Sequence, residues 1–237
     1  MNEDERRIVS PQRSSRRLIP AALLAALVVV SLVTAWLSSR SAPATSPGPE
    51  GVVVRNVPDL ATAGAAGGSK VDGIGCDTIG RAVVHYHVHV LVSMYVNGQR
   101  ERLPAGIGIT APAVTTGTGA STFVDVGLHD CLYWLHTHAY DGIIHVEAPA
   151  RASFTLGQFF DVGGEPLSRV RVGPAIGPVV VFENGVRYRG NPRSVPLLAG
   201  GVIQIDVGSP VVAFQPATFR VTGECGDGTN GCATRLG

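Results

Sequence analysis

Five of the seven histidines fall in two short groups, and they are the residues of this sequence best suited to chemistry. The first group is the H-x-H pair His87 and His89, and the second is the H-x-H pair His136 and His138 followed by His145. On a β-strand, residues i and i+2 point to the same side roughly 6.5–7 Å apart, so both imidazoles of a pair can reach one ion. Imidazole is a common ligand of zinc and copper. We therefore predict that these five histidines bind a transition-metal ion, either Cu or Zn.

The second group makes a geometric prediction. The sequence indicates two strands joined by a turn over residues 139–142. A loop of two or four residues would place His136 opposite His145 and Glu147 on the same face, whereas a loop of three or five would turn His145 away. Glu147 is then a candidate general base, or a carboxylate that supports the ligands from behind, with an ordinary surface carboxylate as the alternative.

Two other interpretations of the histidines stay open. They could form a solvated or hydrogen-bonded face that holds no ligand, or a sensor that titrates near pH 6.5. His85 lies about 13 Å from His89 along a strand, so these two cannot share one ion.

The elements that would carry the histidines have the pattern of β-hairpins. From Val83 to Val96 every second residue, beginning with Val84, is apolar, which predicts a strand with one face in a core. Asn97-Gly98 predicts a tight hairpin turn after this strand, and Asn184-Gly185 predicts another.

The remaining elements complete a β-dominated fold. Two further strands and one short helix with Thr155 as its N-cap are predicted at 202–207, 211–214 and 154–160. The fold class we predict is all-β or β-dominated, a small antiparallel sandwich or barrel with one short helix, preceded by a single transmembrane helix.

The N-terminal part of the chain predicts the location of this domain. Residues 18–37 contain no charge and are long enough to span a bilayer as a helix. Five arginines precede this segment and only Arg40 follows it closely, so we expect a single-pass membrane protein with residues 1–17 in the cytoplasm and the rest outside. A cleaved signal peptide ending near Ala42-Pro43-Ala44 is the alternative.

Composition divides the extracytoplasmic part into three regions. Residues 38–70 are rich in Ser, Ala, Pro and Gly and are predicted to be a flexible linker, although 52–60 could dock as an edge segment. The His-rich β-domain is predicted at 71–222 and a cysteine-containing tail at 223–237. The net charge of +1 argues against nucleic acid as a partner, and the sequence does not identify a protein partner.

Four cysteines in an oxidising compartment suggest two disulfides, for which three pairings are possible. Cys225 and Cys232 flank a short turn-rich loop and form a natural pair, which leaves Cys76 with Cys131. Cysteine ligation of the ion is the rival use, but the sequence has no C-x-x-C.

The order of several motifs resembles a family of membrane-anchored or exported bacterial and archaeal proteins. The matching segments include YHVHVLVSMYVNG, LPAGIGI, CLYWLHTHAYDGIIHVEAP and FTLGQFFDVGG, over about residues 73–164. The resemblance implies that the five histidines, Glu147, Cys76 and Cys131 fall on family positions, whereas His85 and His129 do not. Two departures are Ala139, where the family has Asp, and Gly163, where it has Trp. The resemblance implies sites and location but no activity.

These observations lead to three functional hypotheses. The preferred one is a membrane-tethered extracytoplasmic domain that binds Cu or Zn through its histidines. The second is an envelope interaction or structural module without a metal. The third is a metal-dependent hydrolase or hydratase with Glu147 as base, which would need an open coordination position in a cleft.

Overall fold

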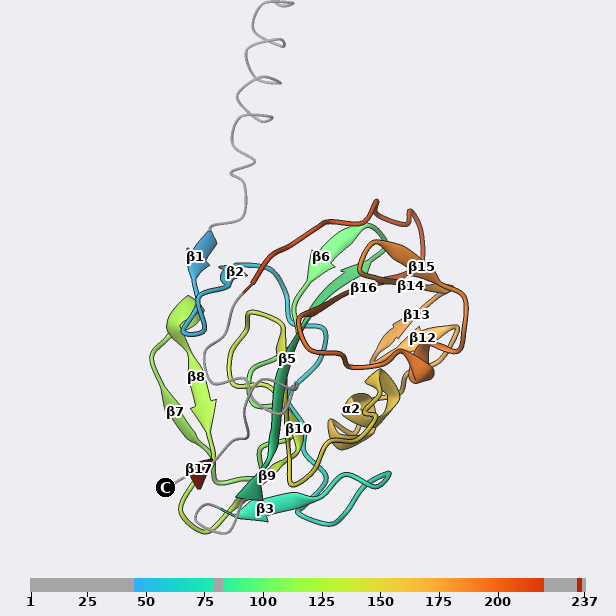
Figure 1. Ribbon diagram of the computed structural model, residues 1–237. Coiled ribbons are helices and arrows are strands. Elements are labelled where there is room, and N and C mark those ends of the chain that lie inside the picture. Colours follow the sequence, from blue (N-terminus) through green and yellow to red (C-terminus); the bar gives the residue numbers. More distant parts are fainter. Residues whose placement is uncertain (1–44, 79–82, 220–233, 236–237) are drawn as a thin grey trace, which may run out of the picture. The chain divides into compact units, whose positions relative to one another are not determined.

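The computed structural model describes residues 45–78, 83–219 and 234–235, all within one compact unit, Pro43–Gly237 (Figure 1). The predicted tail 1–17, the predicted membrane span 18–37 and the cysteines Cys225 and Cys232 lie outside the described residues. Within the described ranges, no helix is long and apolar enough to cross a bilayer.

The described elements are short apart from one strand. The N-terminal half contains β1 (Thr45–Pro47), β2 (Val53–Arg55), β3 (Cys76–Thr78), β4 (Val83–Val84), β5 (Tyr86–Val96), β6 (Gln99–Glu101), β7 (Val114–Thr116) and a 3-10 turn η1 (Gly119–Ser121). The middle contains β8 (Phe123–Asp125), β9 (Cys131–Tyr133), β10 (Leu135–His136), β11 (Ile143–Ala148) and α2 (Leu156–Val162). The rest comprises β12 (Arg171–Val172), β13 (Ala175–Ile176), β14 (Val179–Glu183), β15 (Val186–Tyr188), η2 (Pro192–Ser194), β16 (Gly201–Val207) and β17 (Thr234–Arg235).

One seven-stranded sheet organises the described residues, in the order β10-β11-β5-β16-β14-β15, with β6 also paired to β5 (Figure 1). The 11-residue β5 is its central strand, and it pairs with β11 along its first half and with β16 along its second half. The β-dominated class with one short helix is therefore confirmed for the described part. The prediction of a barrel is wrong, because the sheet is open, with β10 and β15 at its two ends.

The prediction of a purely antiparallel sheet also needs correction. β16 runs parallel to β5, with Gly201 opposite Val90 and Val207 opposite Val96. Parallel neighbours require a long crossover connection, and here more than 100 residues separate the two strands.

Both hairpin turns have the conformation that their sequence predicts. Asn97 and Gly98 have φ values of 49° and 77°, and Asn184 and Gly185 have values of 49° and 84°. Positive φ at both central positions is the type I′ geometry, which matches the twist of the flanking strands. The turns join β5 to β6 and β14 to β15, so these two hairpins are confirmed.

The main core lies on the face of the sheet formed by the alternating apolar residues of β5. Val88, Val90 and Met94 are fully buried there and belong to one cluster with Phe159 of α2. The Thr155 hydroxyl accepts a hydrogen bond from the Gln158 backbone N–H, so the predicted N-cap is confirmed. The helix begins after this cap and ends at Val162, two residues later than predicted.

The opposite face of β5 is also covered, which the alternation did not predict. His89, Leu91, Ser93 and Tyr95 are all buried. Residues 211–214, predicted as a strand, instead form an irregular segment in this region. Side chains of β16 hold the backbone of this segment and of the residue after it: the Val212 N–H donates to Asp206 Oδ1, and the Gln215 N–H donates to Gln204 Oε1, both at 2.8 Å. The side chains therefore replace a strand partner.

The described part of the predicted flexible linker, residues 45–70, packs against the rest of the domain. β1 and β2 pair as a hairpin, and the Leu60 N–H donates to the Arg102 carbonyl at 2.9 Å. Val54 and Leu60 are buried, so these two apolar side chains dock a segment whose Ala, Gly and Pro content suggested a tether. Residues 52–60 therefore dock on the domain, which is the alternative that the sequence left open.

A disulfide joins β3 and β9, the strands that precede the two groups of histidines in the sequence. β3 pairs antiparallel with β9, and Cys76 is bonded to Cys131 across this pair. The predicted Cys76–Cys131 pairing is confirmed, and neither sulfur is therefore a metal ligand.

Candidate metal centre

The register of three neighbouring strands builds the site. His136 of β10 lies opposite His145 of β11, and His145 lies opposite His89 of β5. Two residues further along the same face, Glu147 lies opposite His87. Directly paired residues have Cβ atoms about 4.5–5.5 Å apart, so the ladder alone brings these side chains together. The predicted pairing of His136 with His145, and with it Glu147 on the shared face, is confirmed.

All five predicted histidines lie in one cluster with His145 at its centre. The His145 ring centroid is 4.5 Å from that of His89, 4.7 Å from that of His138 and 5.0 Å from that of His136. The His87 ring is 4.5 Å from the His89 ring. His85 and His129 are exposed and are not part of the cluster.

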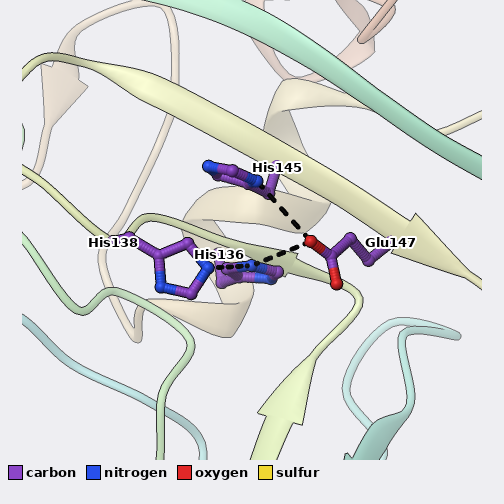
Figure 2. Close-up of side chains that lie close together, drawn as sticks. All are labelled: His136, His138, His145 and Glu147. Carbon is purple, nitrogen blue, oxygen red and sulfur yellow. Dashed lines mark hydrogen bonds and ion pairs between the residues drawn. The ribbon is translucent and has the colours of Figure 1, made fainter. Parts of the chain in front are cut away.

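Two overlapping sets of donor atoms within this cluster could hold a metal ion. The first set is His136, His138, His145 and Glu147 (Figure 2), and the second is His87, His89 and His145. In each set, the donor atoms all lie within 4.8 Å of one another. Figure 2 shows the four side chains of the first set pointing toward one another, with Glu147 Oε1 directed at His136 and His145.

His136 and His138 are oriented as metal ligands. His136 Nδ1 is 2.8 Å from the Tyr133 carbonyl oxygen, and His138 Nδ1 is 2.6 Å from the Val124 carbonyl oxygen. A carbonyl oxygen only accepts, so each Nδ1 carries the proton and each neutral ring keeps its lone pair on Nε2. The two Nε2 atoms face each other at 3.1 Å. Two ligands of a tetrahedral zinc ion would be about 3.3 Å apart, so this pair is spaced for one ion.

A neighbouring hairpin fixes the orientation of His138. The Phe123 ring of β8 stacks on the His138 ring at 4.6 Å, and the adjacent Val124 supplies the carbonyl that holds Nδ1. β8 pairs with β7 outside the main sheet. Ligands of metal sites are commonly held in this way by a hydrogen bond to the nitrogen that does not bind the ion.

The buried environment keeps three of the histidines neutral. Burial, reinforced by the neighbouring histidines, lowers the pKa of His89 to about 2. Burial likewise lowers the pKa of His136 well below its usual value and lowers the pKa of His138. A neutral imidazole is the form that ligates metal ions, so these three rings have the protonation state that binding needs.

His145 and Glu147 form the charged centre of the cluster. Burial opposes charge on His145, but the nearby carboxylates of Glu147 and Glu50 outweigh it and raise the pKa of His145 to about 9. Burial also opposes charge on Glu147, but the neighbouring imidazoles, His145 above all, lower the pKa of Glu147 overall. The metal-free cluster therefore holds a proton on His145 at the place where a cation is favoured.

Glu50 belongs to the site and was missed because it lies in the segment predicted as a flexible linker. Its Oε1 accepts a hydrogen bond from His145 Nε2 at 2.5 Å, which leaves Nδ1 of that ring to face His89 Nε2 at 3.1 Å and Glu147 Oε1 at 3.6 Å. A carboxylate behind a ligating histidine raises the basicity of the ring. The stretch SPGPEG around Glu50 has no spacing that signals this role.

Asp141, in the turn between β10 and β11, is a second missed carboxyl group. It is buried, and burial together with the charge of Glu50 raises the pKa of Asp141 to about 7. The two acids therefore share a proton near neutral pH rather than both ionising. Asp141 also shapes the hairpin, because its Oδ1 accepts from the Ile143 N–H at 3.1 Å.

The chemistry of the donors matches a borderline transition metal. The first set offers three imidazoles and one carboxylate, which is a donor set used by zinc and copper. His136 has no exposed surface, and His138, His145 and Glu147 are each less than 9% exposed. His87 is the most open member, with 18% of its side chain exposed. The arrangement can hold an ion away from solvent, and solvent reaches it from the His87 side.

Comparison with known proteins adds no family to this picture. No protein-family model, curated protein or solved structure matches the chain. The family resemblance and the roles it implies therefore stay predictions, and the functional interpretation depends on the geometry of the buried histidines.

Proposed function

We propose that this protein binds a divalent transition-metal ion, Zn²⁺ or Cu²⁺, at His136, His138, His145 and Glu147. The observation that carries the proposal is the pair of Nε2 lone pairs of His136 and His138, which face each other at 3.1 Å in the protein interior. Two acceptors in this position repel each other unless a cation or a shared proton lies between them. The low pKa of both rings disfavours the proton, which leaves a metal ion as the better partner.

Zinc and copper(II) suit the site better than softer or harder ions. Imidazole nitrogens dominate the donor set, and calcium or magnesium would need more oxygens. Copper(I) prefers sulfur ligands, but Cys131 is in a disulfide and Met94 lies in the core on the other face of β5. One carboxylate with three imidazoles leaves a bound divalent ion with a net charge of +1, which Glu50 then balances from behind His145.

We further propose that the metal-binding domain lies outside the cytoplasm and is tethered to the membrane. The support is the uncharged segment 18–37 with its preceding arginines, together with the Cys76–Cys131 disulfide, which is typical of an oxidising compartment. In this setting the buried cluster would retain a metal ion or deliver it, rather than act on nucleic acid.

Metal uptake by the purified protein tests the proposal. We expect metal-free protein dialysed against a low concentration of Zn²⁺ or Cu²⁺ to take up the ion stoichiometrically, measured by elemental analysis. His136→Ala should weaken binding more than about 100-fold, because loss of an outer hydrogen-bond partner alone costs about 10–100-fold. The matched control is His85→Ala, which removes an exposed histidine just before β5 and should bind like the original protein.

Two outcomes would contradict the proposal. One is wild-type protein that takes up no stoichiometric ion, and the other is uptake that His136→Ala leaves unchanged. The thermal midpoint of metal-free His136→Ala distinguishes a lost ligand from a lost fold, since a folded variant with no uptake supports the ligand role.

A further inference from the structure

The cluster contains more donors than one metal ion uses. A zinc ion takes four ligands in its usual tetrahedral geometry, and the proposed site already has four. His87 and His89 remain, and both lie on β5 at positions i and i+2, in register with Glu147 and His145. His89 is fully buried. Burying a further imidazole is costly unless its nitrogens are paired, and the neighbour of its Nε2 is His145 of the same cluster.

The contacts of His87 and His89 repeat the spacing found between His136 and His138. His89 Nε2 is 3.1 Å from His145 Nδ1, and His87 Nε2 is 3.1 Å from Glu147 Oε1. These are again separations of adjacent ligands around one ion. His87, His89 and His145 also form a set whose donor atoms lie within 4.8 Å of one another.

His145 and Glu147 lie between the two histidine pairs. Glu147 Oε1 is 3.1 Å from His87 Nε2 on one side and 3.9 Å from His136 Nε2 on the other. His145 Nδ1 faces both His89 and Glu147. One nitrogen binds one ion, whereas a carboxylate can bridge two. His136, His138 and His145 therefore stay with the first ion, His87 and His89 face the second, and Glu147 is the donor that both groups can share.

We propose that the cluster is a two-metal centre, in which His87 and His89 bind a second divalent transition-metal ion beside the first. This inference rests on the proposed function, because it presupposes the ion at His136 and His138. The first ion keeps His136, His138 and His145, the second has His87 and His89, and Glu147 is placed to bridge them. Bridged ions in proteins lie about 3.5–4 Å apart.

The carboxyl groups in and around the cluster can balance more of the charge of two divalent ions than the proposed ligands can alone. Three carboxyl groups lie in or against the cluster: Glu147 between the pairs, Glu50 on His145 Nε2, and Asp141 beside Glu50. No Lys or Arg is among the described partners of these groups. Three protein donors on the second ion leave a coordination position for water, and the partly exposed His87 side is where solvent reaches it.

Stoichiometry tests the inference. The full chain, stripped of metal and titrated with Cu²⁺, should bind two ions, counted by elemental analysis after removal of unbound metal. The electron paramagnetic resonance signal of the two-copper form should be broadened or lost by coupling between the ions. His87→Ala should bind one ion and show an isolated copper signal, and His136→Ala should also lose one ion. His85→Ala, two residues from His87 and exposed, should still bind two coupled ions.

The outcomes separate this inference from the proposed function. One ion in the wild-type protein, with His87→Ala unchanged, overturns the two-metal centre and leaves the proposed function standing. Two ions without magnetic coupling also overturn it, because the second would then be a distant adventitious ion. No stoichiometric ion overturns both. His87 is the residue of choice for this test because it is the least buried of the five, so its replacement perturbs the fold least.

Discussion

At the scale of single residues, the cluster places polar groups where burial is most costly. The Tyr133 carbonyl accepts from Nδ1 of His136, and the Val124 carbonyl accepts from Nδ1 of His138. The Nε2 atoms of the two rings face each other. A core built for stability alone would fill this space with apolar side chains. Sites that break this rule are commonly functional, and the stability lost there is recovered elsewhere in the fold.

The protonation of these residues predicts how the stability of the metal-free protein depends on pH. His89, His136 and His138 have lowered pKa values when folded, so the unfolded chain binds more protons below pH 6.5 and stability falls as the pH falls. Each such histidine contributes up to about 1.4 kcal/mol per pH unit. The raised pKa of His145 acts in the opposite sense: its contribution is complete below pH 6.5 and is lost as the pH rises through about 9.

Asp141, whose pKa is raised to about 7, opposes the three histidines in this range, but one group does not offset three. We therefore expect the free energy of unfolding of the metal-free protein to be greatest near pH 6.5. The measurement is urea unfolding in the presence of a chelator at about pH 5, 6.5 and 9. A protein that becomes more stable from pH 6.5 down to pH 5 would contradict the buried, neutral state of the three histidines. Glu147, whose pKa is lowered, adds a further loss only as the pH falls below 4.5.

At the scale of elements, the β10–β11 hairpin decides whether the donors meet. A shift of one residue in its register would turn His145 to the other face of the sheet. Gly142 ends the turn with φ +86°, and its carbonyl accepts a hydrogen bond from the Val92 N–H at 2.8 Å. A Cβ atom at this position would lie 2.3 Å from the Val92 carbonyl oxygen, which is backbone and cannot move aside.

Gly142→Ala is therefore expected to destabilise the protein by about 3 kcal/mol or more, because the strain of positive φ, about 1–2 kcal/mol, adds to the backbone clash. It should also weaken metal binding, since the hairpin must shift. Gly164→Ala is the matched control: Gly164 has φ +71°, and nothing lies within 4 Å of its added Cβ. Urea unfolding compares the two variants, and equal losses of stability would show that the close contact with Val92 is unimportant.

The elements also show which parts of the fold a sequence can predict. Asn97-Gly98 and Asn184-Gly185 act locally, so two hairpins and the alternation of β5 could be predicted from neighbouring residues alone. The parallel pairing of β5 with β16 could not, because it depends on contacts between segments more than 100 residues apart. The same limit applies to the second buried face of β5, since the segments near it are distant in sequence.

At the scale of the whole molecule, the segment from residue 45 to residue 60 packs on the domain and supplies one carboxylate to the candidate metal site. Val54 and Leu60 bury their side chains, and between the two strands of the β1–β2 hairpin Glu50 reaches His145. The composition of this segment resembles that of a linker because only two of its apolar side chains are buried. The histidines were predictable from their spacing, but Glu50 was not, since its role depends on where this segment packs.

This arrangement predicts that the segment is part of the binding site rather than a spacer. A chain that begins at residue 45 should bind metal as tightly as the full chain, whereas a chain that begins at residue 61 should bind at least about 10-fold more weakly, because the carboxylate behind His145 is lost. Competition with a chromophoric chelator measures both affinities.

The full-length Glu50→Gln variant separates loss of this carboxylate from loss of the covering segment. Glutamine still accepts a hydrogen bond from His145 Nε2 but carries no charge, so affinity should fall about 10–100-fold while the number of bound ions is unchanged. Glu165→Gln, at a carboxylate outside the cluster, should leave affinity unaltered. If Glu50→Gln binds normally and the chain from residue 61 does not, the segment acts through its packing alone. Normal binding by both would mean that the segment contributes nothing to the site.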